Sequence, residues 1–210
     1  MNRLSPDDIR NSADYELLAQ VKHKKIKSFI LEQLSPAGRL MSYYSVYQVL
    51  MVLLLLLMFG YSSVQAFLGE PQLLVAMACA LLASFTLLVL LHEAIHAAAY
   101  RLCGIRNLRV GAIWRKFIFY VAADGEVVDY RSFRVVAWAP FVVIKLLCVA
   151  AAVLLYPAVA SWFFITVMAI HSLFCAGDMA MLAFYLKNGR SKLYSFDDLR
   201  EGKTYFYCKR

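Results

Sequence analysis

His92, Glu93 and His96 interrupt a strongly apolar stretch, LLVLLHEAIHAAAY, at residues 87–100. Residues four apart lie on the same face of a helix, so the two imidazoles can bind one metal ion. Glu93 lies about 100° around the helix from His92. From there its carboxylate can take a proton from a water that the metal activates. Ionisable side chains are costly inside an apolar helix, so their presence favours function.

A catalytic zinc site needs a third protein ligand besides His92 and His96. Asp178 and Glu93 are the only acidic residues inside the apolar segments of the chain. His92 and Asp178 each lie 20 residues after the start of their segments, which corresponds to about 30 Å of helix. Asp178 is therefore the preferred third ligand. His171, seven residues earlier on the same face and about 10 Å closer to the outside, is the alternative, or else a pocket residue that supports a ligand.

The composition is typical of a membrane protein. Of 210 residues, 62% are hydrophobic, against roughly 45–50% in soluble domains. The five cysteines form no CxxC pair, which predicts buried thiols rather than a disulfide framework or a cysteine zinc site. No nucleic-acid-binding module accompanies the net charge of +8, so we expect no nucleic-acid partner.

Four apolar segments are each longer than the roughly 20 residues that cross a bilayer. They cover residues 44–68, 72–102, 135–156 and 158–186. Short turns join the first to the second and the third to the fourth, so we expect two helical hairpins. The predicted fold is an all-α polytopic membrane protein with four transmembrane helices.

The basic residues indicate how this domain, residues 44–186, is oriented. Residues 1–43, 101–134 and 187–210 carry seven Lys or Arg each, and the short turns carry none. Because basic flanks stay in the cytoplasm, we expect both termini to be cytoplasmic in a multi-pass protein of the cell membrane. The lipid bilayer is then a partner, and the oligomeric state stays open.

The flanking segments are less informative. Residues 1–43 are expected to form one or two amphipathic helices, the first capped by Ser5 or Asp7. Their lysine cluster is typical either of a helix on an anionic membrane face or of a solvated basic arm. The tail, residues 187–210, carries no recognisable motif.

Between the second and third helices, the sequence KFIFYVAADGEVVDY predicts a β-hairpin at the membrane surface. Its strands are expected at residues 117–121 and 127–130, around a turn at residues 123–125. Such a hairpin could be a simple surface feature, or it could add an extended substrate as a further strand. Pro140 is expected to kink the third helix.

Of the 22 Lys and Arg residues, Lys145 is the only one outside the three basic segments. It could pair with Asp178, stabilise an oxyanion or snorkel to the surface. We favour snorkelling or a structural pair.

The chain resembles the site-2 protease type of intramembrane zinc metalloprotease through LHEAIHAA, AWAPFVV and HSLFCAGDMAM, over about residues 80–186. Site-2 proteases place Gly after the second-motif Asp in an Asn-Pro-rich setting, whereas here Gly177 precedes Asp178 and no Asn-Pro pair occurs. The chain therefore resembles more closely a bacterial family of putative zincin peptidases. That resemblance implies Zn²⁺ and hydrolysis of peptide bonds.

We therefore expect a zinc-dependent endopeptidase, embedded in the membrane, whose substrates are membrane proteins or peptides. Glu93 is its expected catalytic residue, and His92, His96 and Asp178 are its expected zinc ligands. The alternative is a noncatalytic membrane protein that uses the same residues for metal sensing or structure.

Overall fold

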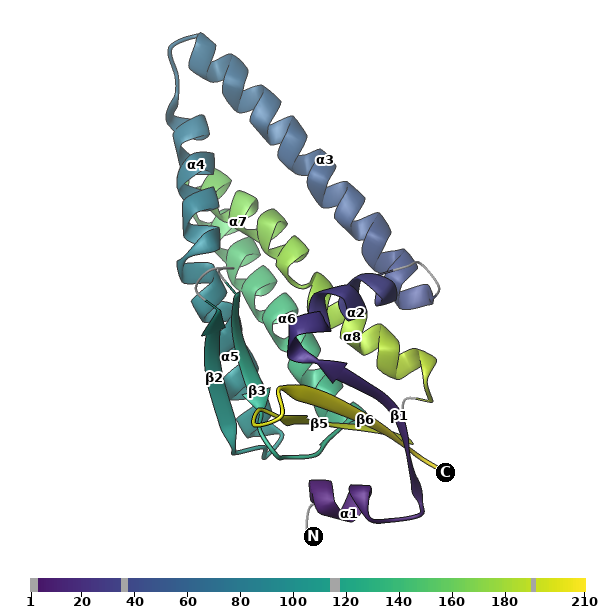
Figure 1. Cartoon of the computed structure of the whole chain (residues 1–210). Helices are drawn as coiled ribbons and strands as arrows, with labels where there is room; N and C mark the ends of the chain where they lie inside the picture. The colour runs from purple at the N-terminus through teal and green to yellow at the C-terminus, as the bar shows by residue number, and fades with distance from the viewer. Residues whose placement is uncertain (1–3, 35–37, 114–117, 190–191) are drawn as a thin grey trace.

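A computed structural model describes residues 4–34, 38–113, 118–189 and 192–210 (Figure 1). The helices are α1 Pro6–Arg10, α2 Ile26–Gln33, α3 Arg39–Phe67, α4 Gln72–Phe85, α5 Leu87–Leu102, α6 Tyr130–Leu154, α7 Ala160–Phe174 and α8 Ala176–Lys187. The strands are β1 Tyr15–Lys22, β2 Leu108–Ile113, β3 Ile118–Ala123, β4 Val128–Asp129, β5 Leu193–Asp198 and β6 Lys203–Lys209. The 3-10 turn η1, His23–Lys25, links β1 to α2.

The long helices account for most of the predicted membrane domain. Among the described residues, α3 and α6 are each long and apolar enough to cross a membrane. The predicted helices 72–102 and 158–186 are not continuous, because α4 and α5 meet at a bend of 44° and α7 and α8 at one of 42°. The chain thus has two such spans, or up to four if each bent pair counts as one.

Each break has an identifiable physical cause. At the first, the hydroxyls of Ser84 and Thr86 donate to the carbonyls of Ala80 and Leu82, at 2.7 and 2.9 Å. Such bonds to the preceding turn bend helices. At the second, the Ser172 carbonyl accepts from Tyr44 and Gln48 of α3, at 2.5 and 2.8 Å. A carbonyl that is held by side chains is less available to the helical amide four residues on, which favours a break there.

A four-stranded antiparallel sheet, in the order β1-β6-β5-β4, lies at one end of the helices (Figure 1). It joins the N-terminal arm, the segment after α5 and the C-terminal tail. The prediction of helices throughout residues 1–43 is therefore wrong for residues 15–22, which form β1, although α1 and α2 are helical and Ser5 caps α1. The strand forms because it pairs with β6 along most of its length, and strand formation depends on such pairing more than on intrinsic preference.

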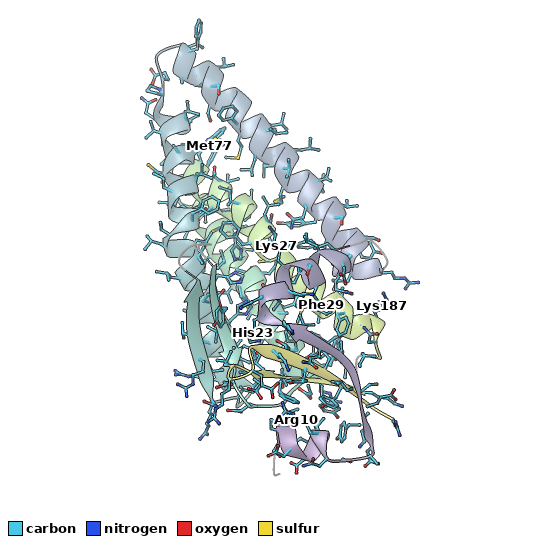
Figure 2. All side chains as sticks on the ribbon, in the orientation of Figure 1. Arg10, His23, Lys27, Phe29, Met77 and Lys187 are labelled. Atoms are coloured by element: carbon cyan, nitrogen blue, oxygen red, sulfur yellow. The ribbon has the colours of Figure 1, made fainter. Side chains whose placement is uncertain are left out.

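Aromatic packing fixes the sheet against the helices. Phe29 of α2 packs on Phe184 of α8 and on Phe206 of β6, with ring centroids 5.1 and 5.8 Å apart (Figure 2). Phe206 and Tyr185 are fully buried in the same cluster. The arm and the tail are therefore structural parts of the domain.

The predicted hairpin has different partners from those expected. β3 contains the predicted strand 117–121, apart from residue 117, which lies outside the described residues. However, β3 pairs with β2, and the second predicted strand contributes only β4, which pairs with β5. The turn at Gly125 (φ 67°) therefore links two sheets instead of closing one hairpin.

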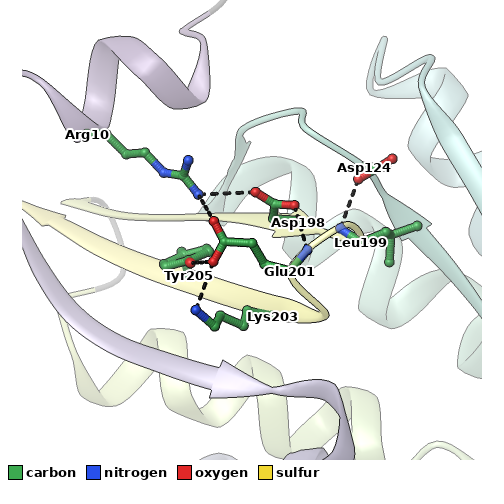
Figure 3. A network of polar contacts seen from close by, with 7 residues as sticks. All are labelled: Arg10, Asp124, Asp198, Leu199, Glu201, Lys203 and Tyr205. Atoms are coloured by element: carbon green, nitrogen blue, oxygen red, sulfur yellow. Dashed lines mark hydrogen bonds and ion pairs between the residues drawn. The ribbon is translucent and has the colours of Figure 1, made fainter.

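A polar network ties α1 to the turn between β5 and β6 (Figure 3). The Arg10 guanidinium contacts Asp198 at 3.3 Å and Glu201 at 3.9 Å. Asp124, which precedes β4, accepts a hydrogen bond from the Leu199 amide at 3.1 Å. These contacts hold the loop after β3 against the sheet, and β3 itself packs on α5.

Candidate metal centre

Three side chains converge between α5 and α8. The Nε2 atom of His92 lies 3.3 Å from Asp178 Oδ2, and the Nε2 atom of His96 lies 3.3 Å from Asp178 Oδ1. The side chains of the two histidines are 9% and 10% exposed, and that of Asp178 is 22% exposed. The two hairpins thus bring their ionisable residues to one level, as the residue counts predict.

The helix breaks help to position these residues. α5 begins just after the break at Thr86, so that His92 and His96 lie on its buried face. Asp178 lies in the first turn of α8, just after the break at Cys175. A side chain added at Gly177 would make only an ordinary contact, 3.7 Å from Ile30 Cδ1. Gly177 is therefore not required for close packing of the helices.

The other ring nitrogen of His96 is held by the backbone of α6. His96 Nδ1 lies 3.1 Å from the Val136 carbonyl oxygen. A carbonyl only accepts hydrogen bonds, so Nδ1 carries a proton, and Nε2 is left as the ring nitrogen that can bind a metal beside Asp178. Val136 is four residues before Pro140, which has no amide to donate to that carbonyl. Pro140 thus leaves an acceptor available for His96.

His171 holds the other ring nitrogen of His92. His92 Nδ1 lies 3.0 Å from His171 Nε2, and His171 is fully buried. When His92 donates from Nδ1, its Nε2 is likewise left as the nitrogen that can bind a metal beside Asp178. Asp178 thus occupies the position of a third ligand, whereas His171 lies behind His92.

Glu93 lies beside this cluster and not in it. Its half-buried carboxylate interacts with the backbone of Val121 in β3. The carboxylate is therefore placed between the histidines of α5 and the β2–β3 hairpin.

Lys145 belongs to α6, and its side chain extends toward α3. Its Nζ atom contacts the Tyr47 hydroxyl and lies 4.4 and 4.6 Å from the ring centroids of Tyr47 and Phe141. Its polar partner is therefore Tyr47 and not Asp178. Cation–π contacts of this kind favour a structural pair over snorkelling.

The residues present fit a zinc ion. The ligand atoms of His92, His96 and Asp178 all lie within 4.8 Å of one another. Tetrahedral zinc with bonds of about 2.0–2.1 Å requires neighbouring ligand atoms to be roughly 3.3 Å apart. Two imidazoles with their outer nitrogens held, together with one carboxylate, are a donor set that zinc sites use.

A second group shares His92. His92, His171 and Cys175 are all buried, and one ligand atom from each lies within 4.8 Å of the others. The sequence predicts buried thiols and no cysteine zinc site, so Cys175 is not among the expected ligands. The spacing of His171 and Cys175, four residues apart, was the available signal. Nothing in the sequence indicated that the Val136 carbonyl would contact His96, except that Pro140 follows four residues later.

The family comparison agrees with this geometry. Residues 85–193, more than half of the chain, match the family described as "Putative zincin peptidase", and the chain belongs to that family. The match includes His92, Glu93, His96, His171 and Asp178. No curated protein and no solved structure matches the chain.

Proposed function

We propose that the protein is a zinc-dependent endopeptidase that is embedded in a membrane and hydrolyses peptide bonds of membrane proteins or peptides. One observation carries this proposal. The Nε2 atoms of His92 and His96 meet the Asp178 carboxylate at 3.3 Å each, in a chain of the zincin family.

Each residue has a role that follows from its contacts. His92, His96 and Asp178 would hold the zinc. When bound, zinc would act as a Lewis acid that polarises the scissile carbonyl and makes water more acidic. His171 and the Val136 carbonyl orient the two imidazoles. Glu93 accepts a proton from the attacking water and delivers it to the leaving amine, which is general acid–base catalysis.

The membrane location rests on the helices and their charged flanks. Large apolar side chains are exposed along the helices, including Leu57 of α3 (73%), Leu82 of α4 (71%) and Leu146 of α6 (65%). Such surfaces are unfavourable in water but suit lipid. Of the basic residues that define the cytoplasmic side, Arg3, Arg115, Lys116 and Arg190 lie outside the described residues.

Sheet topology supports one common side for the three basic segments, because each supplies a strand to the same sheet. We infer that this side is cytoplasmic. A reporter enzyme fused to the C-terminus should be active only inside the cell. Activity outside the cell would overturn this orientation.

A peptide substrate suits the position of Glu93. Peptidases bind extended chains, and strand addition supplies that conformation. β3 packs against α5, and the Glu93 carboxylate interacts with the backbone of Val121 in that strand. A peptide bound along this region would lie close to the carboxylate.

Glu93→Gln tests catalysis separately from metal binding. The variant keeps all three ligands, so we expect full zinc content, with turnover reduced by about 10²–10⁴-fold because the base is lost. Proteomes of cells that express either form should differ in cleaved membrane proteins. Glu32→Gln, a change on an exposed position of α2, is the matched control and should cleave normally.

Two results would contradict the proposal. If Glu93→Gln cells showed the same cleavage products as wild-type cells, Glu93 would not be the base. If neither form cleaved any protein although both bound zinc, the protein would be a noncatalytic zinc-binding protein.

A further inference from the structure

We propose that His171, Cys175 and the Nδ1 side of His92 form a second metal site that favours a soft or borderline cation such as Cd²⁺, Cu⁺ or excess Zn²⁺. The two sites share the imidazole of His92 and use its two different ring nitrogens. Metal binding at the second site does not depend on the proposed function. Inhibition of peptide cleavage by a metal at that site rests on the proposed function.

The geometry fits a metal without large movement. His92 Nδ1 and His171 Nε2 are 3.0 Å apart, and His171 Nε2 lies 3.7 Å from Cys175 Sγ. A metal with bonds of about 2.0–2.1 Å to nitrogen and 2.3 Å to sulfur requires separations of roughly 3.3 and 3.5 Å. The observed pair of distances lies close to these values.

The backbone presents the ligands as metal sites in helices do. His171 and Cys175 are four residues apart at the end of α7, so their side chains lie on one face. His92 faces them from α5. His171 and Cys175 are fully buried, and His92 is 7% exposed.

The donor set selects the cation. One thiolate and two imidazoles favour soft or borderline metals and disfavour Mg²⁺ and Ca²⁺, which prefer oxygen ligands. Metal binding would release the thiol proton of Cys175 to solvent.

The two sites should exclude each other, because a neutral imidazole has one lone pair. When His92 binds the first metal through Nε2, its proton is on Nδ1, as the contact with His171 allows. When Nδ1 binds a metal at the second site, the proton sits on Nε2, and the first site loses a ligand. A soft metal at the second site would therefore displace zinc from the first.

A cadmium titration tests the second site. The purified zinc-loaded protein would carry serine at Cys79, Cys103 and Cys208, which are not fully buried, and would be titrated with CdCl₂. We expect one Cd²⁺ per chain, detected by the ultraviolet charge-transfer band between thiolate and cadmium, and release of zinc in proportion to that band. In this parent, Cys175→Ala and His171→Ala should each abolish the band.

Cys148→Ala is the matched control, because Cys148 is a buried thiol of α6 in a different cluster. It should keep the full band. Asp178→Ala should also keep it, since Asp178 belongs only to the first site. The zinc content of Cys175→Ala before titration checks that this variant is folded, and Cys175→Ser provides a second variant that preserves the size of the side chain.

The proposal is overturned if the parent shows no thiolate band, or if Cys175→Ala shows the same band as the parent. Cadmium binding with the band but without zinc release would overturn the mutual exclusion. None of these readings uses peptide cleavage. The expected cadmium band together with unaltered cleavage in Glu93→Gln would therefore support the second site and refute Glu93 as the catalytic base.

Discussion

Replacing Pro140 by alanine tests how the outer nitrogen of His96 is held. The Val136 carbonyl accepts from His96 Nδ1 at 3.1 Å, and Pro140 offers it no competing amide. In Pro140→Ala, the new amide of residue 140 would donate to the same carbonyl, and His96 would lose part of its hydrogen bond.

The expected loss of affinity follows from the net free energy of one hydrogen bond, about 0.5–1.5 kcal/mol. Zinc affinity should therefore fall by about 2- to 12-fold. The free energy of unfolding of the zinc-free protein should change in the opposite direction. Removing a proline from a helix interior raises the free energy of unfolding by about 3 kcal/mol. Losing two buried methylene groups costs about 1.6 kcal/mol, so the free energy of unfolding should rise by roughly 1.4 kcal/mol.

Zinc affinity would be measured in detergent by competition with a chromophoric chelator, and stability by thermal unfolding of the zinc-free protein. Pro71→Ala is the control, because Pro71 precedes α4 and leaves no carbonyl unpaired inside a helix. Unchanged zinc affinity in Pro140→Ala would refute the reasoning. So would a fall in stability that accompanies the fall in affinity, since the effect would then be general damage.

Two further predictions concern the ligands and the sheet. Asp178→Ala should lower zinc content as much as His96→Ala does. His171→Ala should weaken zinc binding by about 10–100-fold, the usual effect of losing a residue that orients a ligand. Zinc per chain in dialysed protein measures both effects, and full occupancy in Asp178→Ala would refute the assignment. Phe206→Ala should destabilise the protein by about 3–5 kcal/mol, because the ring is fully buried between the sheet and α8. Thermal unfolding measures this loss, with the half-exposed Leu17→Ala as control, and equal midpoints for the two variants would show that the sheet does not support the helices.

The metal centre could be predicted from the sequence because its signals are local. His92 and His96 are one helical turn apart, and counting residues from the turns brings Asp178 to the same level. These inferences needed only helical geometry and the cost of burying charge. The sequence left His171 as an alternative ligand or a pocket residue, and it did not predict the contact of His171 with His92 Nδ1.

The elements that the sequence did not predict depend on contacts between distant segments. β1 pairs with β6 from Tyr15–Lys209 to Lys22–Lys203. The sequence YELLAQVK at residues 15–22 alternates apolar and polar side chains except at Leu18, a strand pattern that the prediction of helices did not use. The break before α8 likewise depends on Tyr44 and Gln48 of another helix. Tertiary contacts of this kind override local preference.

The most direct test of the account is X-ray absorption at the zinc edge of purified protein loaded with one equivalent of zinc. We expect only nitrogen and oxygen neighbours at about 2.0–2.1 Å, from the two imidazoles of α5 and from Asp178. Sulfur at about 2.3 Å would place the zinc on Cys175 instead, and would contradict the assignment of His92, His96 and Asp178 as its ligands.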